Sequence, residues 1–249
     1  MRILGIIPAR LGSTRLPNKP LQLLAGEPLV TRVIERVQEH RLVDRLVVAT
    51  ESPMVARVVE PSGVPVVMTH DGHSTGTERV AEAVGRPECE ADGYDIIVNI
   101  QGDEPFIPRE AVEGAIAMVR RGNDVGTAAA PLEATLADDP GRVKVVVDVN
   151  GRALYFSRAV IPFRRDSSAP ATDLYWQHLG IYAYSKATLA RWVALPPAPA
   201  EKAEQLEQLR ALHHGMSLGV ARLGEAALPG VDTLEDLRRA EAHWLAHAR

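Results

Sequence analysis

The chain contains a single cysteine, Cys89, among its 249 residues. A disulfide cannot form within one chain, and a thiolate metal cluster cannot be built from it, so any bound metal must have oxygen or imidazole ligands. Aromatic residues are also scarce, at 4% of the composition. We therefore expect a core made mainly of valine, leucine, isoleucine and alanine.

Long apolar runs and excess positive charge are missing too. The longest early apolar run, Ile3 to Pro8, is far shorter than the roughly 18 residues that a membrane span needs, and it follows Arg2 without the apolar region of a signal peptide. We therefore expect a cytoplasmic protein with no membrane partner. The formal net charge of −4 gives no global field that attracts a polyanion, so nucleic acid is not an expected partner.

The remaining composition is that of an ordinary globular protein, with 46% hydrophobic and 24% charged residues. Over the first half of the chain, apolar runs typical of buried strands alternate with segments of helical periodicity. Strands are predicted at 2–8, 45–50, 64–68 and 94–100, and helices at 28–39, 53–60, 77–84 and 108–120. This alternation predicts an α/β fold with a mostly parallel central sheet flanked by helices, and ligands bound at the carboxyl ends of the strands.

The pattern changes after residue 122. Segments 143–149 and 153–157 flank Asn150-Gly151, a strong hairpin signal because both turn residues tolerate positive φ. An inserted antiparallel ribbon is therefore expected. Beyond it we predict a polar surface loop at 163–173, a strand at 177–184 and a helix at 200–213. A last helix is expected to begin after Thr233, with Asp236 completing the cap, and to run to the C-terminus. We expect a single domain over 1–249 with the insertion at about 143–184.

Three cations lie in the loop that follows the first strand, at Arg10, Arg15 and Lys19. The loop also contains Gly12 and Ser13, which allow the backbone to approach a ligand closely. Such a loop suits a triphosphate, although it matches neither GxxxxGK[ST] nor GxGxxG. The alternative is a solvated basic loop, which we disfavour because three neighbouring cations without an anion would repel one another.

Polar groups also follow two other strands and precede the last helix. Asp103, in Gln101-Gly102-Asp103-Glu104-Pro105, suits Mg²⁺, which takes one or two protein carboxylates plus substrate phosphates; an Asp-containing turn that caps the next helix is an equal alternative. Residues 75–79 open a helix whose free N–H groups could bond a base or an anion, but by themselves they indicate a simple cap. Asp232, just before the last helix, is also most simply explained by capping.

Together these segments resemble the 3-deoxy-manno-octulosonate cytidylyltransferases, also called CMP-Kdo synthetases. The shared motifs occur in the family's order between residues 10 and 237: RLGSTRLPNKP, STGTER, VNIQGDEP, ALYFSR, HLGIYAYS, LEQLR and GVDTLEDL. The resemblance implies a nucleotide-diphospho-sugar transferase type of fold and a homodimer. It also implies a Mg²⁺-dependent transfer of CMP from CTP to the anomeric hydroxyl of 3-deoxy-D-manno-octulosonate (Kdo), which releases pyrophosphate and supplies lipopolysaccharide biosynthesis.

The resemblance also assigns roles to residues at the matching positions. CTP would be held by Arg10, Ser13, Arg15, Lys19, Thr75, Gly76, Arg79 and Gln101. The sugar acid would be held by Gln101, Arg158, His178, Tyr182, Glu207 and Gln208. Asp103 and Asp232 would bind Mg²⁺ and, with Arg15 and Lys19, form the catalytic group. One departure is Asn18, which replaces the glycine common in the family and is tolerable because asparagine enters the left-handed region easily.

Two other functions stay open. A cytidylyltransferase for a related acidic sugar, such as an amino-substituted Kdo or a nonulosonic acid, would share most of these motifs. A non-catalytic nucleotide-binding protein would retain the fold, but the presence of Asp103, Asp232, Arg15 and Lys19 argues against it.

Overall fold

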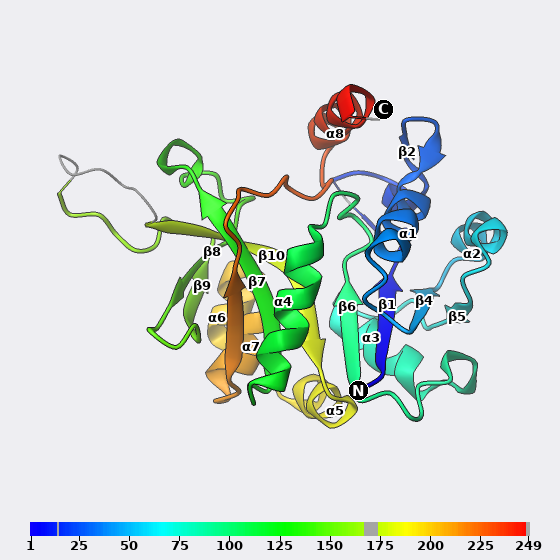
Figure 1. Ribbon diagram of the computed structural model, residues 1–249, viewed down its shortest axis with the longest axis horizontal. Helices are drawn as coiled ribbons and strands as arrows, with labels where there is room; N and C mark the ends of the chain where they lie inside the picture. The colour runs from blue at the N-terminus through cyan, green and yellow to red at the C-terminus, as the bar shows by residue number, and fades with distance from the viewer. Residues whose placement is uncertain (14, 167–173, 248–249) are drawn as a thin grey trace. The chain divides into compact units, whose positions relative to one another are not determined.

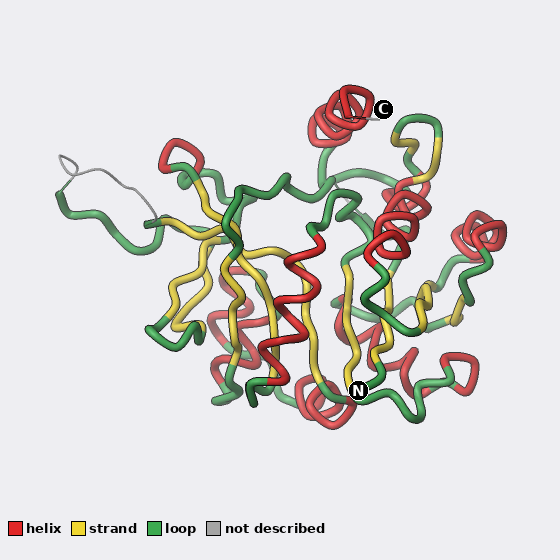
Figure 2. Tube along the Cα trace, viewed as in Figure 1, coloured by secondary structure: helices red, strands yellow, loops and turns green. Residues whose placement is uncertain are grey.

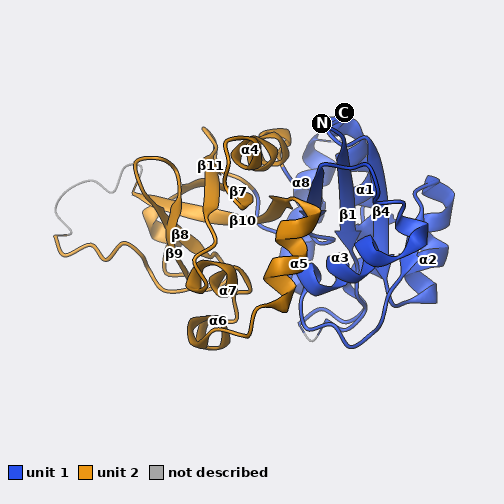
Figure 3. Ribbon diagram, turned by 90° about the horizontal axis from the view of Figure 1, so that it is seen from below, with its two compact units in different colours: residues 1–107, 228–249 blue, residues 108–227 orange. Residues whose placement is uncertain are grey.

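The computed structural model describes residues 1–13, 15–166 and 174–247. Two compact units divide the chain: unit 1 contains residues 1–107 and 228–249, and unit 2 contains residues 108–227 (Figure 3). The expectation of one domain with an insertion at about 143–184 stays a prediction. In the described part of the chain, no helix combines the length and the apolar character needed to cross a membrane.

Unit 1 contains a parallel sheet whose strands follow the order β6-β1-β4-β5 (Figure 1). Their bounds are β1 Ile3–Pro8, β4 Arg45–Thr50, β5 Val66–Met68 and β6 Ile96–Ile100. Ile6 of β1 lies opposite Val47 of β4 and Asn99 of β6. β1, β4 and β6 are almost continuously buried, as expected for a parallel sheet with covered faces, whereas the edge strand β5 is only partly buried.

Figure 2 shows the helices and strands of the chain. The helices of unit 1 are α1 Leu29–His40, α2 Pro53–Val59, α3 Gly76–Gly85 and α8 Leu234–His247. In unit 1, α1, α2 and α3 alternate with the sheet strands along the sequence, whereas α8 comes after unit 2. Ser52 caps α2 by accepting from the Met54 and Val55 amides, with Pro53 at the first helical position, as predicted. A two-stranded antiparallel sheet, β2 Leu23–Leu24 and β3 Glu27–Pro28, lies outside the parallel sheet. Residues 248–249 of the predicted last helix lie outside the described residues.

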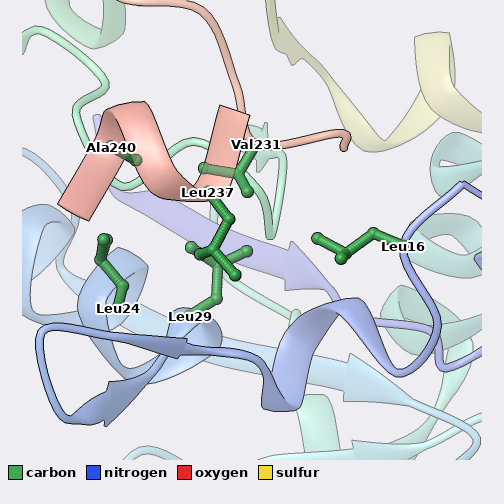
Figure 4. Packing of buried hydrophobic residues seen from close by; sticks show 6 residues of the cluster. All are labelled: Leu16, Leu24, Leu29, Val231, Leu237 and Ala240. Carbon is green, nitrogen blue, oxygen red and sulfur yellow. The ribbon is translucent and has the colours of Figure 1, made fainter. Parts of the chain in front are cut away.

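A small apolar cluster joins distant parts of the chain within unit 1 (Figure 4). Leu16 and Leu24 come from the segment after β1, Leu29 begins α1, and Val231 and Leu237 belong to the return segment with α8. All are nearly fully buried. Because Leu16 and Val231 are immediate neighbours of Arg15 and Asp232, this cluster fixes the backbone of two predicted site residues.

Unit 2 combines parallel and antiparallel strand pairs. Its elements are β7 Val125–Leu132, β8 Lys144–Val147, β9 Ala153–Ser157, β10 Tyr175–Tyr184, β11 Leu218–Arg222, α4 Arg109–Arg120, α5 Lys186–Ala194, α6 Pro199–Glu204 and α7 Gln208–His213. β7 pairs with β11 in parallel and with β10 in antiparallel fashion, and β8 pairs antiparallel with both β10 and β9. α4 packs so closely on β7 that a Cβ at Gly126 would lie 1.9 Å from the Ala115 carbonyl oxygen.

The fold class is therefore the predicted α/β type, with an antiparallel ribbon formed by β8 and β9. The turn of that ribbon differs from the prediction, because only Gly151 has positive φ (78°) and the Gly151 amide donates to the Asp148 carbonyl. Val145 of β8 is buried, so the apolar side of the ribbon is partly covered within unit 2.

One predicted helix is wrong. The segment 200–213 forms two short helices, α6 and α7, because Gln205 adopts a left-handed conformation with φ of 53° and ends the first. Of the predicted surface loop at 163–173, residues 167–173 lie outside the described residues. Short 3₁₀ turns cover Lys19–Leu21, Glu60–Ser62, Pro87–Cys89 and Ala134–Leu136.

Candidate active site

A cavity of about 490 Å³ opens at the carboxyl ends of the parallel strands of unit 1. All of its lining residues belong to unit 1. They include every residue that the resemblance assigned to CTP or to Mg²⁺: Arg10, Ser13, Arg15, Lys19, Thr75, Gly76, Arg79, Gln101, Asp103 and Asp232. The sequence prediction thus placed these ten residues at one site, although their roles stay predictions.

The loop after β1 forms one wall of this cavity. The Ala9 amide donates to the Ala49 carbonyl and so continues the strand pairing, after which the chain leaves the sheet. The Ser13 hydroxyl oxygen accepts from the Leu16 amide at 3.3 Å, which leaves the hydroxyl hydrogen able to donate into the cavity. Asn18 adopts the left-handed conformation expected of it, with φ of 52°. Thr14 lies outside the described residues.

Two carboxylates converge on one ammonium at the floor of the cavity. Lys19 Nζ lies 2.5 Å from Asp103 Oδ2 and 2.7 Å from Asp232 Oδ1. Arg15 Nη2 lies 3.0 Å from Asp232 Oδ2. Two of the three loop cations therefore have internal counter-charges, so the argument that these cations would repel one another without an external anion is wrong.

The pKa values of this cluster follow from burial and charge. Burial by itself would lower the pKa of Lys19, but the carboxylates of Asp103 and Asp232 outweigh it and the pKa lies above its usual value. Burial would likewise raise the pKa of Asp232, but Lys19 and then Arg15 outweigh it and the pKa lies below its usual value. Both groups therefore stay charged near neutral pH.

The loops carrying the two aspartates are held together by the backbone. The Val231 amide donates to the Asp103 carbonyl at 2.8 Å. Gly102 passes so close to β1 that a Cβ there would lie 2.8 Å from the Pro8 carbonyl oxygen. These contacts explain why carboxylates far apart in the sequence share one cation.

Neither aspartate caps a helix, which removes the simpler explanation for both. The residue that precedes α4 is Pro108, five positions after Asp103. At α8 the cap is formed by Thr233 and Asp236: the Asp236 carboxylate accepts from the Thr233 amide at 2.9 Å, and the Asp236 amide donates to the Thr233 hydroxyl. The Asp232 carboxylate therefore pairs with Lys19 and Arg15 and does not cap α8.

Glu104, which follows Asp103, was not predicted as a site residue. Burial, and then the charges of Asp103 and Asp232, raise the pKa of Glu104 to about 8. The Gly230 turn lies beside it, since a Cβ on that glycine would be 3.1 Å from Glu104 Oε1. Glu104 is therefore mostly protonated near pH 7, and its position in the Gln101–Pro105 motif was the available signal.

Arg79 also lines the cavity and is buried, with 2% of its side chain exposed. Its Nη1 lies 2.9 Å from Glu51 Oε2 and donates to the Thr69 hydroxyl at 2.5 Å and to the His70 carbonyl at 3.1 Å. Thr75 both lines the cavity and caps α3, accepting from the Glu78 amide at 3.2 Å. The cap interpretation and the site interpretation of residues 75–79 are therefore compatible.

The residues assigned to the sugar, Gln101 excepted, belong to unit 2. The Tyr182 hydroxyl donates to Gln208 Oε1 at 3.1 Å, and the rings of Tyr182 and His178 lie 5.6 Å apart. His178 Nε2 lies 2.9 Å from the Thr127 hydroxyl, and burial lowers its pKa to about 3. Glu207 precedes α7 directly.

Arg158 lies among backbone carbonyls of unit 2. Its Nε donates to the Glu204 carbonyl at 2.7 Å, Nη1 to the Pro140 carbonyl at 2.9 Å and Nη2 to the Gln205 carbonyl at 3.3 Å. A guanidinium has five N–H donors, so two remain for a ligand.

The chemistry of the Asp103 and Asp232 pair fits Mg²⁺. Their oxygens already meet at one positive charge, the Lys19 ammonium. Among the described residues no group of three or more histidine, cysteine, aspartate or glutamate side chains is arranged for a metal. Mg²⁺ does not require one, because it commonly binds one or two carboxylates together with substrate phosphates and water.

Comparison with known proteins agrees with this geometry. The model of the cytidylyltransferase family matches residues 4–218. A 3-deoxy-manno-octulosonate cytidylyltransferase of Gemmatimonas aurantiaca is 50% identical over 98% of this chain and 95% of its own length. Another from an Anaeromyxobacter species is 45% identical over 100% of this chain and 99% of its own.

A solved structure gives the same result in three dimensions. It is a CMP:2-keto-3-deoxy-manno-octonic acid synthetase in complex with CTP, 36% identical, with a TM-score of 0.88 over 99% of both chains. This match confirms the predicted fold class, and the family model and relatives confirm a nucleotidyltransferase. The chain thus belongs to the 3-deoxy-manno-octulosonate cytidylyltransferase family.

Proposed function

We propose that this cytidylyltransferase transfers CMP from CTP to the anomeric hydroxyl of Kdo with the help of Mg²⁺. The observation that carries the proposal is the cavity in which Arg15, Lys19, Asp103 and Asp232 meet. The names of the relatives and the CTP bound to the similar structure support this choice of substrates.

The reaction exchanges one phosphorus–oxygen bond for another. The anomeric oxygen forms a bond to the α-phosphorus of CTP, the bond to the pyrophosphate oxygen breaks, and the hydroxyl proton leaves the sugar. Such reactions depend mainly on in-line positioning and on neutralising charge at the phosphates. Mg²⁺ held by Asp103 and Asp232 would neutralise part of the phosphate charge.

The chain's own cations would supply the remaining positive charge. Lys19 and Arg15 line the cavity, and the raised pKa keeps the Lys19 ammonium protonated at any physiological pH. Arg10 lines the same wall and is exposed. Within the described residues Arg10 makes no ion pair, so it can turn its guanidinium to the triphosphate without losing a partner.

On the sugar side we assign the polar groups of unit 2 to Kdo. Tyr182 and Gln208 already form one hydrogen-bonded pair, which can orient hydroxyl groups. His178 would act as a neutral donor or acceptor, because its pKa of about 3 excludes an imidazolium near pH 7. Arg158 would offer its two remaining N–H groups to the carboxylate, and Glu207 would accept from sugar hydroxyls.

We further propose a cytoplasmic homodimer that serves lipopolysaccharide biosynthesis. The β8–β9 ribbon carries exposed apolar side chains at Val149, Leu154 and Tyr155, which a second subunit would cover. Light scattering at micromolar concentration should give twice the monomer mass. A monomer mass would remove this part of the proposal.

A matrix of pyrophosphate-release assays tests the substrates. CTP and UTP are each combined with Kdo, an amino-substituted Kdo and N-acetylneuraminate, with and without Mg²⁺. We expect the highest turnover with CTP, Kdo and Mg²⁺. Equal or better turnover with another sugar acid, or with UTP, would replace the substrate assignment, and the absence of pyrophosphate release in every combination would favour a non-catalytic nucleotide-binding protein.

A further inference from the structure

Glu51 joins two walls of the nucleotide cavity without lining the cavity itself. It directly follows the last residue of β4, Thr50, at the carboxyl edge of the sheet. Its Oε1 accepts from the Leu11 amide at 2.8 Å, and its Oε2 lies 2.9 Å from Arg79 Nη1. One carboxylate thus accepts a hydrogen bond from the loop after β1 with one oxygen and forms an ion pair with the buried guanidinium of α3 with the other.

The burial of these groups makes the contacts important. Only 2% of the Arg79 side chain and 17% of the Glu51 side chain are exposed. Burial lowers the pKa of Arg79, and Glu51 is the largest influence acting against this fall. Without Glu51 the buried guanidinium keeps only the weaker influence of Glu82 and Asp71, so it will move toward other acceptors or water.

Both contacts place groups that face the cavity. Leu11 lies between Arg10 and Gly12, which line the cavity on the triphosphate side of the proposed site. Arg79 lines the wall proposed for cytidine, together with Thr75 and Gly76. Breaking one link should therefore disturb one wall, and breaking both links should disturb both.

We propose that Glu51 is a positioning residue that sets the loop after β1 and Arg79 at the spacing that CTP requires. This inference rests on the proposed function, since it takes CTP as the ligand of the cavity. Glu51 acts through Leu11 and Arg79 and touches no reacting atom. Local sequence patterns do not indicate this role, because Thr50-Glu51-Ser52-Pro53 is typical only of the start of a helix.

Two substitutions separate the two links. In Glu51→Gln the amide oxygen can still accept from the Leu11 amide, but the amide NH₂ faces a second donor at Arg79. We expect the Kd for CTP and for CMP to rise about tenfold, which corresponds to about 1.4 kcal/mol, and the Kd for inorganic triphosphate to stay within about twofold. Glu51→Ala breaks both links, so binding of all three ligands should weaken.

Steady-state kinetics add a second readout. Because Glu51 positions groups that bind CTP, Glu51→Gln should raise KM for CTP while kcat and KM for Kdo change by less than about twofold. Glu90→Gln is the matched control: Glu90 pairs with Arg45 at 3.1 Å at the other end of β4 and does not line the cavity. This variant also removes a carboxylate from an arginine, but it should bind CTP normally.

Isothermal titration and thermal unfolding of the full chain decide between the outcomes. If the Kd of Glu51→Gln for CTP lies within twofold of the wild-type value, the inference is overturned. It is also overturned if binding of CMP and binding of triphosphate weaken equally and the Tm falls, because that result indicates general destabilisation. If Glu51→Gln does not fold, Glu51→Asp serves instead. Its carboxylate is one methylene shorter and cannot span both partners, so normal CTP affinity in that variant also overturns the inference. A wild-type chain that does not bind CTP would instead refute the proposed function.

Discussion

Asp232→Asn removes one negative charge from the cavity of unit 1 while retaining the shape of the side chain. In the wild type this carboxylate lies 2.7 Å from Lys19 Nζ and 3.0 Å from Arg15 Nη2. In the variant Lys19 has only Asp103 left, and Arg15 loses its ion pair. One half of the proposed Mg²⁺ site is lost with them.

The expected magnitudes differ for stability and for turnover. Because 37% of the Asp232 side chain is exposed, solvent screens its ion pairs, and their loss should lower the free energy of unfolding by only about 1 kcal/mol. Turnover should fall about 10²- to 10³-fold, the usual effect of removing one preorganised electrostatic group. Pyrophosphate release measured over a range of Mg²⁺ concentrations gives the turnover, and urea denaturation gives the stability.

Asp124→Asn supplies a matched control in unit 2. It removes a carboxylate that accepts from the Ser217 amide and hydroxyl and lies 3.7 Å from Arg191 Nη1, with 34% of its side chain exposed, so it should also cost about 1 kcal/mol. Its turnover should stay close to that of the wild type. Two variants of similar stability would then differ about a hundredfold or more in rate.

The double variant provides the stricter test of a shared ion. Asp103→Asn and Asp232→Asn damage the same cation site, so together they should lose much less than the product of their separate losses. Fully multiplicative losses, or an Asp232→Asn enzyme with near-normal turnover, would refute the reasoning.

Three further predictions concern single residues. Gly102→Ala should lower both Tm and CTP affinity, because a Cβ would lie 2.8 Å from the Pro8 carbonyl oxygen; unchanged thermal unfolding and titration curves would contradict this. The pKa of Glu82 is about 2 in the folded protein against 4.5 ordinarily, so its contribution to stability is present above about pH 4.5 and disappears as pH falls toward 2. In Glu82→Gln the free energy of unfolding, measured by urea denaturation, should therefore depend less on pH over this range. His178, with a pKa of about 3, should show no imidazole NMR titration between pH 8 and pH 5, whereas a midpoint near 6.5 would contradict its burial.

Unit 1 was largely predictable because its local signals agree with its packing. The β4 strand has its predicted bounds, α2 begins at the predicted Ser52-Pro53 cap, and α8 begins after Thr233 as expected. Because ligands of α/β proteins bind at the carboxyl ends of parallel strands, the candidate site residues could then be predicted to lie at that edge of the sheet. The pairing of Lys19 with Asp232 was not predictable, since it depends on the return of a segment 213 residues away.

Unit 2 was harder because tertiary packing overrides local propensity there. The β7 sequence VGTAAAPL is rich in alanine and has only two of the β-branched residues that mark a strand, Val125 and Thr127, yet it lies buried beneath α4. The predicted helix at 200–213 has residues suited to a helix throughout. However, the Glu204 carboxylate accepts from the Ser157 hydroxyl and the Arg158 amide, and the chain turns at Gln205. Glu51 shows the same limit at the site, because its role comes from partners on two other elements.

The division of unit 1 between residues 1–107 and 228–249 has a consequence for synthesis. The ribosome makes Arg15 and Lys19 early, but Asp232 emerges only after the whole of unit 2. Until then Leu16, Leu24 and Leu29 lack the α8 side chains that bury them in the complete protein. A nascent chain that ends before α8 therefore leaves this apolar cluster incomplete, and one that stops after unit 2 leaves Arg15 without its ion pair to Asp232. The proposed Mg²⁺ site is therefore complete only in chains whose synthesis has passed Asp232.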